Sequence, residues 1–273
     1  MGASGRIGKV LRAHWPDGAA RWQARGALAG CVRLDPLADP GALAAAAAGC
    51  DTILCLAGVV PGRGGSFEDN VALGLAAVRA GAEARARVLL ASSAAVYGRA
   101  PGLLGEDAAP APETDYGRAK VAMEAEAAAL GARLGVAVTS LRLGNIAGVD
   151  AILGGWRPGF ELDRFADGRT PRRSYIGLAT LVRALLALCD GPPLPGVLNV
   201  AAPGVLEMGA LLDAAGLAWA PRAPGPEAIP EVALDVAALE GFFPLSPRDS
   251  LAETVVAEWR ALGTTLSGTD TRP

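Results

Sequence analysis

The chain has 273 residues, of which 51% are hydrophobic and 19% charged, and a chain of this size buries a core without disulfides or metals. Its net charge of −3, from 25 basic and 28 acidic residues, lacks the positive excess by which proteins bind nucleic acid or anionic membranes, so we expect neither partner. The start does not read as a signal peptide, and no apolar run is long enough to span a bilayer. We therefore expect a cytoplasmic location.

Short apolar runs alternate with helical stretches along the chain. In chain order, the sequence predicts a helix over 9–14, a strand over 20–24, a helix over 42–48, a strand over 52–57, a helix over 70–81, a strand over 88–92, a helix over 116–134, a strand over 136–143, a helix over 178–190 and a strand over 197–200. Most of these strands lack polar alternation, which is typical of parallel strands covered on both faces. The pattern predicts an α/β fold with a doubly wound, Rossmann-like parallel sheet.

The chain is predicted to form two units. Residues 1–148 make the dinucleotide-binding domain, and residues 174–202 return to it. Pro- and Gly-rich loops then mark a smaller C-terminal substrate lobe, built from 149–173 and 203–263. The polar residues 264–273 are predicted to form a flexible tail.

The cysteines argue against a metal site. Cys31, Cys50, Cys55 and Cys189 form no CxxC pair, and the lone histidine, His14, has no cysteine near it. We expect free thiols in a reducing compartment and no bound metal.

A glycine-rich turn, Gly2-Ala3-Ser4-Gly5-Arg6-Ile7-Gly8, leads into the first predicted helix. Glycine permits positive φ and close approach to a pyrophosphate, which a helix N-terminus attracts, although such a turn also occurs with a purely structural role. In a doubly wound sheet a central strand comes before this turn. We expect that first strand to be missing or truncated here; the alternative is that the neighbouring strands close the gap.

Tyr116 and Lys120 stand four residues apart on a predicted helix and so share one face. A nearby ammonium stabilises a phenolate and lowers the tyrosine pKa, which makes tyrosine useful as an acid or base near neutral pH. A pair at this spacing is by itself more often a solvated helix face. Here, however, an upstream strand ends at Ser92-Ser93, which brings a hydroxyl to the carboxyl edge of the sheet, where ligands bind in open α/β folds.

Together these motifs resemble the extended short-chain dehydrogenase/reductase family, in its NAD-dependent epimerase/dehydratase group. The segment from Ser92 to Gly98 looks like that of UDP-galactose 4-epimerase and its relatives. The matching segments follow in order over nearly the whole chain: residues 2–8, 56–58, 70–71, 92–98, 116–120, 141–145 and 198–200.

The resemblance implies roles for single residues. Tyr116 would be the general acid/base, Lys120 would lower its pKa and hold the nicotinamide ribose, Ser93 would bond the substrate oxygen, and Asn70 would shape the proton relay. We expect an NAD(P)-dependent oxidoreductase or epimerase that exchanges hydride between nicotinamide and a secondary alcohol or ketone, on a sugar or nucleotide sugar. The implied cofactor contacts are Gly2, Ser4, Gly5, Arg6, Ile7, Gly8, Leu56, Ala57, Gly58, Tyr116 and Lys120.

The end of the second strand bears on the choice of cofactor. Relatives that prefer NAD usually carry an acidic residue there, whereas this chain has Arg25, which suits a 2′-phosphate unless it is a plain surface arginine. We expect NADP to be favoured over NAD. Asp35 and Leu37 are candidates for the adenine pocket.

The resemblance also bears on the reaction. Sugar-nucleotide dehydratases of this family carry an Asp-Glu pair where this chain has Ala94 and Ala95, so 4,6-dehydration is disfavoured. Asn145 and Arg173 are candidates for substrate binding, since Arg173 resembles the arginine that grips a diphosphate in such epimerases.

Two further expectations follow from the resemblance. A non-catalytic NAD(P)-binding sensor or regulator on the same fold is the alternative function, but such proteins usually lose the Tyr–Lys pair that this chain keeps. The family also implies a homodimer through the Tyr–Lys helix and its neighbour.

Overall fold

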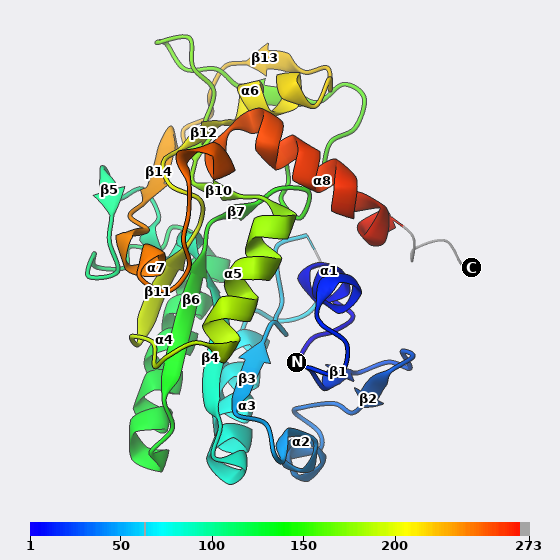
Figure 1. The fold of residues 1–273 in the computed structure, drawn as a ribbon. Coiled ribbons are helices and arrows are strands. Elements are labelled where there is room, and N and C mark those ends of the chain that lie inside the picture. The colour runs from blue at the N-terminus through cyan, green and yellow to red at the C-terminus, as the bar shows by residue number, and fades with distance from the viewer. Residues whose placement is uncertain (63, 268–273) are drawn as a thin grey trace.

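The computed structural model describes residues 1–62 and 64–267, and its centre is a four-stranded parallel sheet (Figure 1). The strand order is β11–β6–β4–β3, and the bounds are β3 (Thr52–Cys55), β4 (Arg87–Ser93), β6 (Val138–Leu143) and β11 (Val197–Val200). These are the four strands predicted from residue 52 onward. Because Ser93 lies opposite Leu143 in register, the carboxyl ends of β4 and β6 meet at one edge of the sheet.

Helices cover both faces of this sheet. Side chains alternate along β4, so Leu89 packs into one core with α5 (Leu178–Asp190), while Val88 and Leu90 pack into another with α3 (Asp69–Ala84) and α4 (Asp115–Leu134). α1 (Arg6–His14) lies beside α5. Burial on both sides explains why β4 reads as a continuous apolar run, and the predicted α/β, Rossmann-like fold is confirmed. Of the helices in the described part of the chain, none has the length and apolarity that crossing a membrane requires.

Capping residues set the ends of α4, the helix that bears Tyr116. The hydroxyl of Thr114 accepts a hydrogen bond from the Gly117 amide at 3.1 Å and so satisfies a donor that the first turn would leave free. At the other end Gly135 adopts φ +68, a left-handed conformation that costs glycine little. Tyr116 therefore stands in a capped first turn.

A second parallel sheet, of two strands, stands apart from the first. β1 (Trp22–Ala24) pairs with β2 (Cys31–Arg33), and α2 (Pro40–Ala47) follows them. Within the described residues no strand pairing joins β1 to β3, so the alternative that neighbouring strands close the gap is wrong. The first residues bridge it: the Met1 nitrogen donates to the Leu54 carbonyl, the Leu56 amide donates to the Met1 carbonyl, and the Ala3 amide donates to the Gln23 carbonyl.

The second lobe has its own sheet and core. The sheet has the order β12 (Leu206–Glu207), β9 (Arg172–Arg173), β14 (Glu231–Leu234), β5 (Leu103–Leu104). β12 packs with α6 (Met208–Ala214) and α8 (Ala252–Ser267), whereas the buried side chains of β14 and β5 pack into the core of the first sheet. β5, which the sequence places in the first unit, pairs with β14 instead, and α8 continues through residues 264–267, which were predicted as tail. Residues 268–273 of that predicted tail lie outside the described residues. The remaining elements are β7 (Asn145–Ile146), β8 (Glu161–Asp163), β10 (Tyr175–Ile176), β13 (Ala220–Arg222), α7 (Ala237–Glu240), η1 (Ala94–Tyr97) and η2 (Pro247–Ser250).

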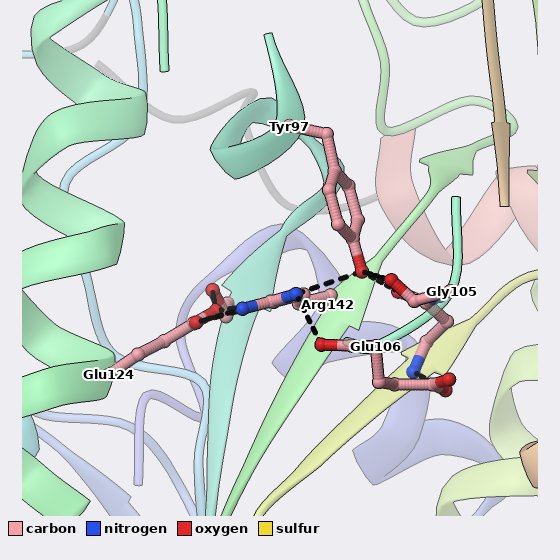
Figure 2. Close-up of polar contacts among 7 residues, drawn as sticks. Tyr97, Gly105, Glu106, Glu124 and Arg142 are labelled. Atoms are coloured by element: carbon pink, nitrogen blue, oxygen red, sulfur yellow. Dashed lines mark hydrogen bonds and ion pairs between the residues drawn. The ribbon is translucent and has the colours of Figure 1, made fainter. Parts of the chain in front are cut away.

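A buried ion pair lies between α4 and the sheet (Figure 2). The guanidinium of Arg142, on β6, donates to the carboxylate of Glu124, on α4, at 2.8 Å. Both residues are more than nine-tenths buried. The Ser92 hydroxyl, on β4, donates to the same carboxylate. One carboxylate thus ties α4 to two adjacent strands.

The other side of the guanidinium leads toward the second lobe. Arg142 Nη1 donates to the Tyr97 hydroxyl at 2.9 Å, and that hydroxyl lies 2.8 Å from Asn199 Oδ1 on β11. Asn199 Nδ2 donates to the carbonyls of Leu104, the last residue of β5 (Leu103–Leu104), and of Asp235, which directly follows β14 (Glu231–Leu234). Every member of this chain of contacts is satisfied, as buried polar groups must be.

Glu124→Gln tests how much stability this network holds. The change keeps the side-chain size but leaves a buried guanidinium without its counter-ion, so we expect the free energy of unfolding to fall by about 3 kcal/mol in urea titrations. Glu126→Gln, on the exposed side of the same helix, is the matched control and should shift it by less than about 0.5 kcal/mol. Equal losses in the two variants would show that the pair contributes no special stability.

Candidate functional site

The glycine-rich turn is shaped by close backbone contacts. Gly2 adopts φ +85, and a Cβ atom on it would lie 2.7 Å from the Ala57 nitrogen. A Cβ atom on Gly8 would lie 2.3 Å from the Gly2 carbonyl oxygen. Ser4 and Gly5 are exposed in the loop, and Arg6, Ile7 and Gly8 form the first turn of α1. The turn therefore presents bare backbone and a helix N-terminus, a combination that attracts phosphate groups.

Gln23 holds this turn in place, and the sequence analysis did not find it. Its Oε1 accepts a hydrogen bond from the Gly2 amide at 3.0 Å, and its Nε2 donates to the Leu34 carbonyl at 2.8 Å. The available signal was a polar residue inside a predicted strand, and the structure shows that this glutamine is buried.

The side chains of Asn70 and Lys120 converge at the end of β3, where Leu56, Ala57 and Gly58 follow the strand. Asn70, in the first turn of α3, is 1% exposed and donates to the carbonyls of Val59 and Phe67. A Cβ atom on Gly58 would lie 2.6 Å from Asn70 Oδ1 and 3.5 Å from Lys120 Nζ. Only glycine leaves room for both groups, and Asn70 fixes the loop through backbone bonds.

Ser93, Tyr116 and Lys120 lie together at the carboxyl edge of the sheet. Ser93 is the last residue of β4, and its side chain lies next to that of Tyr116. Lys120 Nζ lies 5.8 Å from the centre of the Tyr116 ring and donates to the Ala91 carbonyl at 2.7 Å. The predicted grouping of a hydroxyl, a phenol and an ammonium is thus present in one place.

The pKa of Tyr116 differs from the expectation. Burial raises this pKa above its ordinary value, and the neighbouring Ser93 hydroxyl offsets only part of the rise. The ammonium of Lys120 lies over the ring and bonds a carbonyl, so it does not give the net lowering that the sequence predicted. As the residues stand, Tyr116 is a protonated phenol at neutral pH.

Lys120 is a buried cation. Its residue is 4% exposed, and burial lowers the pKa of its ammonium from 10.5 to about 8, against the opposing influence of Cys55 and Glu124. Glu124 is therefore a second missed residue that bears on the site: it lies one turn beyond Lys120 on α4, and a carboxylate at that spacing on the same face was the available signal.

The residues predicted for the adenosine end follow the first two strands. Arg25 is exposed directly after β1. Asp35 follows β2, and its carboxylate accepts a hydrogen bond from the Leu37 amide at 2.9 Å, while Leu37 is 42% exposed. All three predicted residues thus follow the carboxyl ends of β1 and β2.

The residues predicted for substrate binding lie on short strands beyond β6. Asn145, on β7, pairs with Tyr175 on β10, whose hydroxyl donates to the Asp150 carboxylate at 2.8 Å. Arg173, on β9, is half-buried and donates to the carbonyls of Arg172 and Ile229. The adjacent Ser174 carbonyl accepts from the Asn145 amide at 2.9 Å, so the two candidates are joined through one backbone contact.

The buried lysine predicts a pH dependence of stability. Because its pKa is lower in the folded than in the unfolded chain, the unfolded state binds more protons between about pH 8 and pH 10.5, and stability rises with pH across that window. We expect the unfolding free energy, measured relative to a Lys120→Met variant, to increase by on the order of 1–3 kcal/mol from pH 7 to pH 10. A difference that stays flat over this range would mean that Lys120 keeps an ordinary pKa.

Comparisons with known proteins were made against families, curated proteins and solved structures. A model of the NAD dependent epimerase/dehydratase family matches residues 1–155. No curated protein matches the chain.

Solved structures match over nearly its whole length at low identity. MoeE5 in complex with UDP-glucuronic acid and NAD is 22% identical, with a TM-score of 0.73 over 95% of this chain and 97% of that one. A UDP-glucose 4-epimerase from Thermus thermophilus in complex with NAD is 19% identical, with a TM-score of 0.69 over 95% and 97%. TunA, an NAD-dependent NDP-hexosamine 5,6-dehydratase, is 21% identical, with a TM-score of 0.71 over 95% and 96%.

At these identities the structural likeness shows a shared fold, while the family model spans more than half of the sequence and includes the glycine-rich turn, Ser93 and the Tyr–Lys pair. The chain belongs to the NAD-dependent epimerase/dehydratase family.

Proposed function

We propose that this protein uses a nicotinamide dinucleotide to oxidise and reduce a secondary alcohol on the sugar of a nucleotide sugar, as an epimerase or a simple oxidoreductase. The observation that carries the proposal is the meeting of Ser93, Tyr116 and Lys120 at the carboxyl edge of the sheet. The substrate class is supported by MoeE5, whose structure holds UDP-glucuronic acid with NAD, and by the Thermus UDP-glucose 4-epimerase.

The residues present fit a dinucleotide. Gly2, in the glycine-rich turn, and Gly58, after β3, leave the backbone bare, and Cβ atoms there would lie within 2.7 Å of other atoms. The exposed loop of Ser4 and Gly5 leads to the N-terminus of α1, where backbone amides would hold the diphosphate. Lys120 and Tyr116 would hold the nicotinamide ribose. When bound, the cofactor supplies or accepts hydride.

Tyr116 moves the proton of the substrate hydroxyl. With its pKa raised by burial, the phenol donates a proton to a carbonyl oxygen during reduction. Oxidation needs the phenolate, which is stabilised by the positive charge of Lys120, whose Nζ lies 5.8 Å from the centre of the Tyr116 ring. Ser93, next to Tyr116, holds the substrate oxygen in line for the transfer.

Epimerisation or simple reduction is proposed in preference to dehydration. Eliminating water from a sugar needs an additional acid and base, whereas Ala94 and Ala95, which directly follow Ser93 in η1, carry methyl groups.

A non-catalytic sensor is the alternative function and would bind a dinucleotide without turnover. The buried Lys120 ammonium beside the half-buried Tyr116 favours the enzyme, because a sensor has no need to hold a charged group at this depth. A homodimer through α3 and α4 stays a prediction, supported by a groove between their outer faces that Phe67, Val71 and Ala122 line.

Tyr116→Phe tests the catalytic proposal. We expect kcat on a panel of UDP-hexoses to fall by about 10²- to 10⁴-fold, because the proton carrier is removed, while the Kd of the dinucleotide changes little. Arg118→Ala, an exposed position two residues further on α4, is the control and should keep full turnover. Unchanged kcat in Tyr116→Phe would remove the assignment of Tyr116. Dinucleotide binding without turnover of any substrate in the unmodified protein would favour the sensor.

Arg25 is the basis on which we propose NADP as the preferred cofactor, although the matching structures of MoeE5 and the Thermus epimerase hold NAD. In fluorescence titrations, Arg25→Ala should weaken NADPH about 10-fold or more by removing a charge-assisted bond to the 2′-phosphate, and leave NADH unchanged. Arg79→Ala, exposed on α3, is the control. Tighter binding of NADH than of NADPH to the unmodified protein would make the NADP preference wrong.

A further inference from the structure

The ring of Phe67 lies against the ring of Tyr116. Their centroids are 5.8 Å apart and their planes are inclined by 60°, within the range of separations at which aromatic rings attract each other. Phe67 stands two residues before α3, and Tyr116 stands in the first turn of α4. A half-buried aromatic side chain therefore contacts the proposed acid/base from outside its own helix.

The packing of α3 on α4 supports this contact (Figure 1). A Cβ atom on Gly74 of α3 would lie 2.9 Å from Met123 Cγ on α4, so the two helices approach each other closely. Gly74 follows Phe67 by seven residues, and Met123 follows Tyr116 by the same number. A single register of the two segments thus places both contacts.

The buried Asn70 fixes the backbone of Phe67. Its Nδ2 donates to the Phe67 carbonyl at 3.0 Å and to the Val59 carbonyl at 3.1 Å, and its Oδ1 accepts from the Val59 amide at 3.2 Å. The backbone amide of Asn70 donates to the same Phe67 carbonyl at 3.1 Å. Because both side-chain donors of Asn70 are used by backbone carbonyls, this residue acts on Tyr116 through Phe67 and not by donating to a ligand.

Phe67 also borders a groove between the outer faces of α3 and α4, which Tyr116 does not line. The charged group over the Tyr116 ring is Lys120 Nζ, 5.8 Å from the ring centre. Burial is the largest influence on the pKa of Tyr116, which it raises. The Phe67 ring contributes to this burial, because it separates the phenol ring from solvent in the groove. The charged side chains that line the groove are Glu68, Asp115, Arg118 and Glu126.

We propose that Phe67 is a positioning residue for Tyr116: its ring holds the phenol in place and keeps water from it during proton transfer. This inference rests on the proposed function, in which Tyr116 moves the proton of the substrate hydroxyl. A tyrosine in the first turn of a helix is held by few neighbours of its own helix, and a packed ring restricts its side-chain torsions. Misplacing a reacting group by about 1 Å costs on the order of 10²-fold in rate.

Phe67→Ala tests the role of the ring in turnover. We expect kcat on the panel of UDP-hexoses to fall by about 10- to 100-fold, while KM and the Kd of the dinucleotide stay within about twofold, because the ring contacts the phenol. Phe67→Tyr restores an aromatic ring and should keep kcat within about threefold of the unmodified protein. Leu75→Ala removes an apolar side chain that lines the same groove eight residues further on, and it should change neither kcat nor KM.

A second readout needs no substrate. The ultraviolet absorbance of phenolate is followed after rapid jumps in pH, and the part of the signal that Tyr116→Phe removes belongs to Tyr116. The chain has three tyrosines, and the other two, Tyr97 and Tyr175, are fully buried. Because Phe67→Ala admits water to the phenol, the pKa of Tyr116 should fall toward its ordinary value of about 10, whereas Leu75→Ala should leave it in place.

A loss of kcat together with a lower Tyr116 pKa, in Phe67→Ala and not in Leu75→Ala, supports the inference. Full kcat in Phe67→Ala, an equal loss in Leu75→Ala, or a Tyr116 pKa that Phe67→Ala leaves unchanged would overturn it. If Phe67→Ala does not fold, Phe67→Leu removes the ring but keeps apolar bulk, and the same two readouts decide. Failure of the proposed function is a different result: the unmodified protein would turn over no substrate, while the titration still reports whether Phe67 controls the phenol.

Discussion

The ion pair between Arg142 and Glu124 is the interaction on which the geometry of the proposed active site depends. A guanidinium that is more than nine-tenths buried must have its charge compensated, and here a single carboxylate does so. That carboxylate stands on the helix of Tyr116 and Lys120 and also accepts from Ser92, the neighbour of Ser93. Satisfying the buried charge therefore sets the register between the helix that holds the phenol and the strand that holds the hydroxyl.

Burial both creates and limits the chemistry at this edge. It lowers the pKa of Lys120 from 10.5 to about 8 and raises that of Tyr116, so the two pKa values move apart and the ammonium becomes the stronger acid of the two. Holding an ammonium at this depth costs stability, which Ala91 offsets in part by accepting a hydrogen bond. The family relation accounts for the presence of both groups, and the packing of α4 on the sheet accounts for their protonation.

The relation between the two sheets is the least conventional part of the fold. The three solved structures compared above are 19–22% identical to this chain, yet each matches it over 95% of its length. Residues 1–3, which include the start of the glycine-rich turn, hydrogen-bond to both β1 and β3.

Local pattern was sufficient for much of this protein. The strand over 197–200 and the helix over 178–190 have the predicted bounds, because apolar periodicity decides them within a few neighbouring residues. The convergence of Ser93, Tyr116 and Lys120 was also predictable, since parallel strands end at one edge. Only the tertiary structure decided the contacts between distant residues, which are Glu124 with Arg142, Gln23 with the glycine-rich turn, and β5 with β14. No short pattern encodes them, because each is selected by the need of a buried charge or backbone group for a partner elsewhere in the fold.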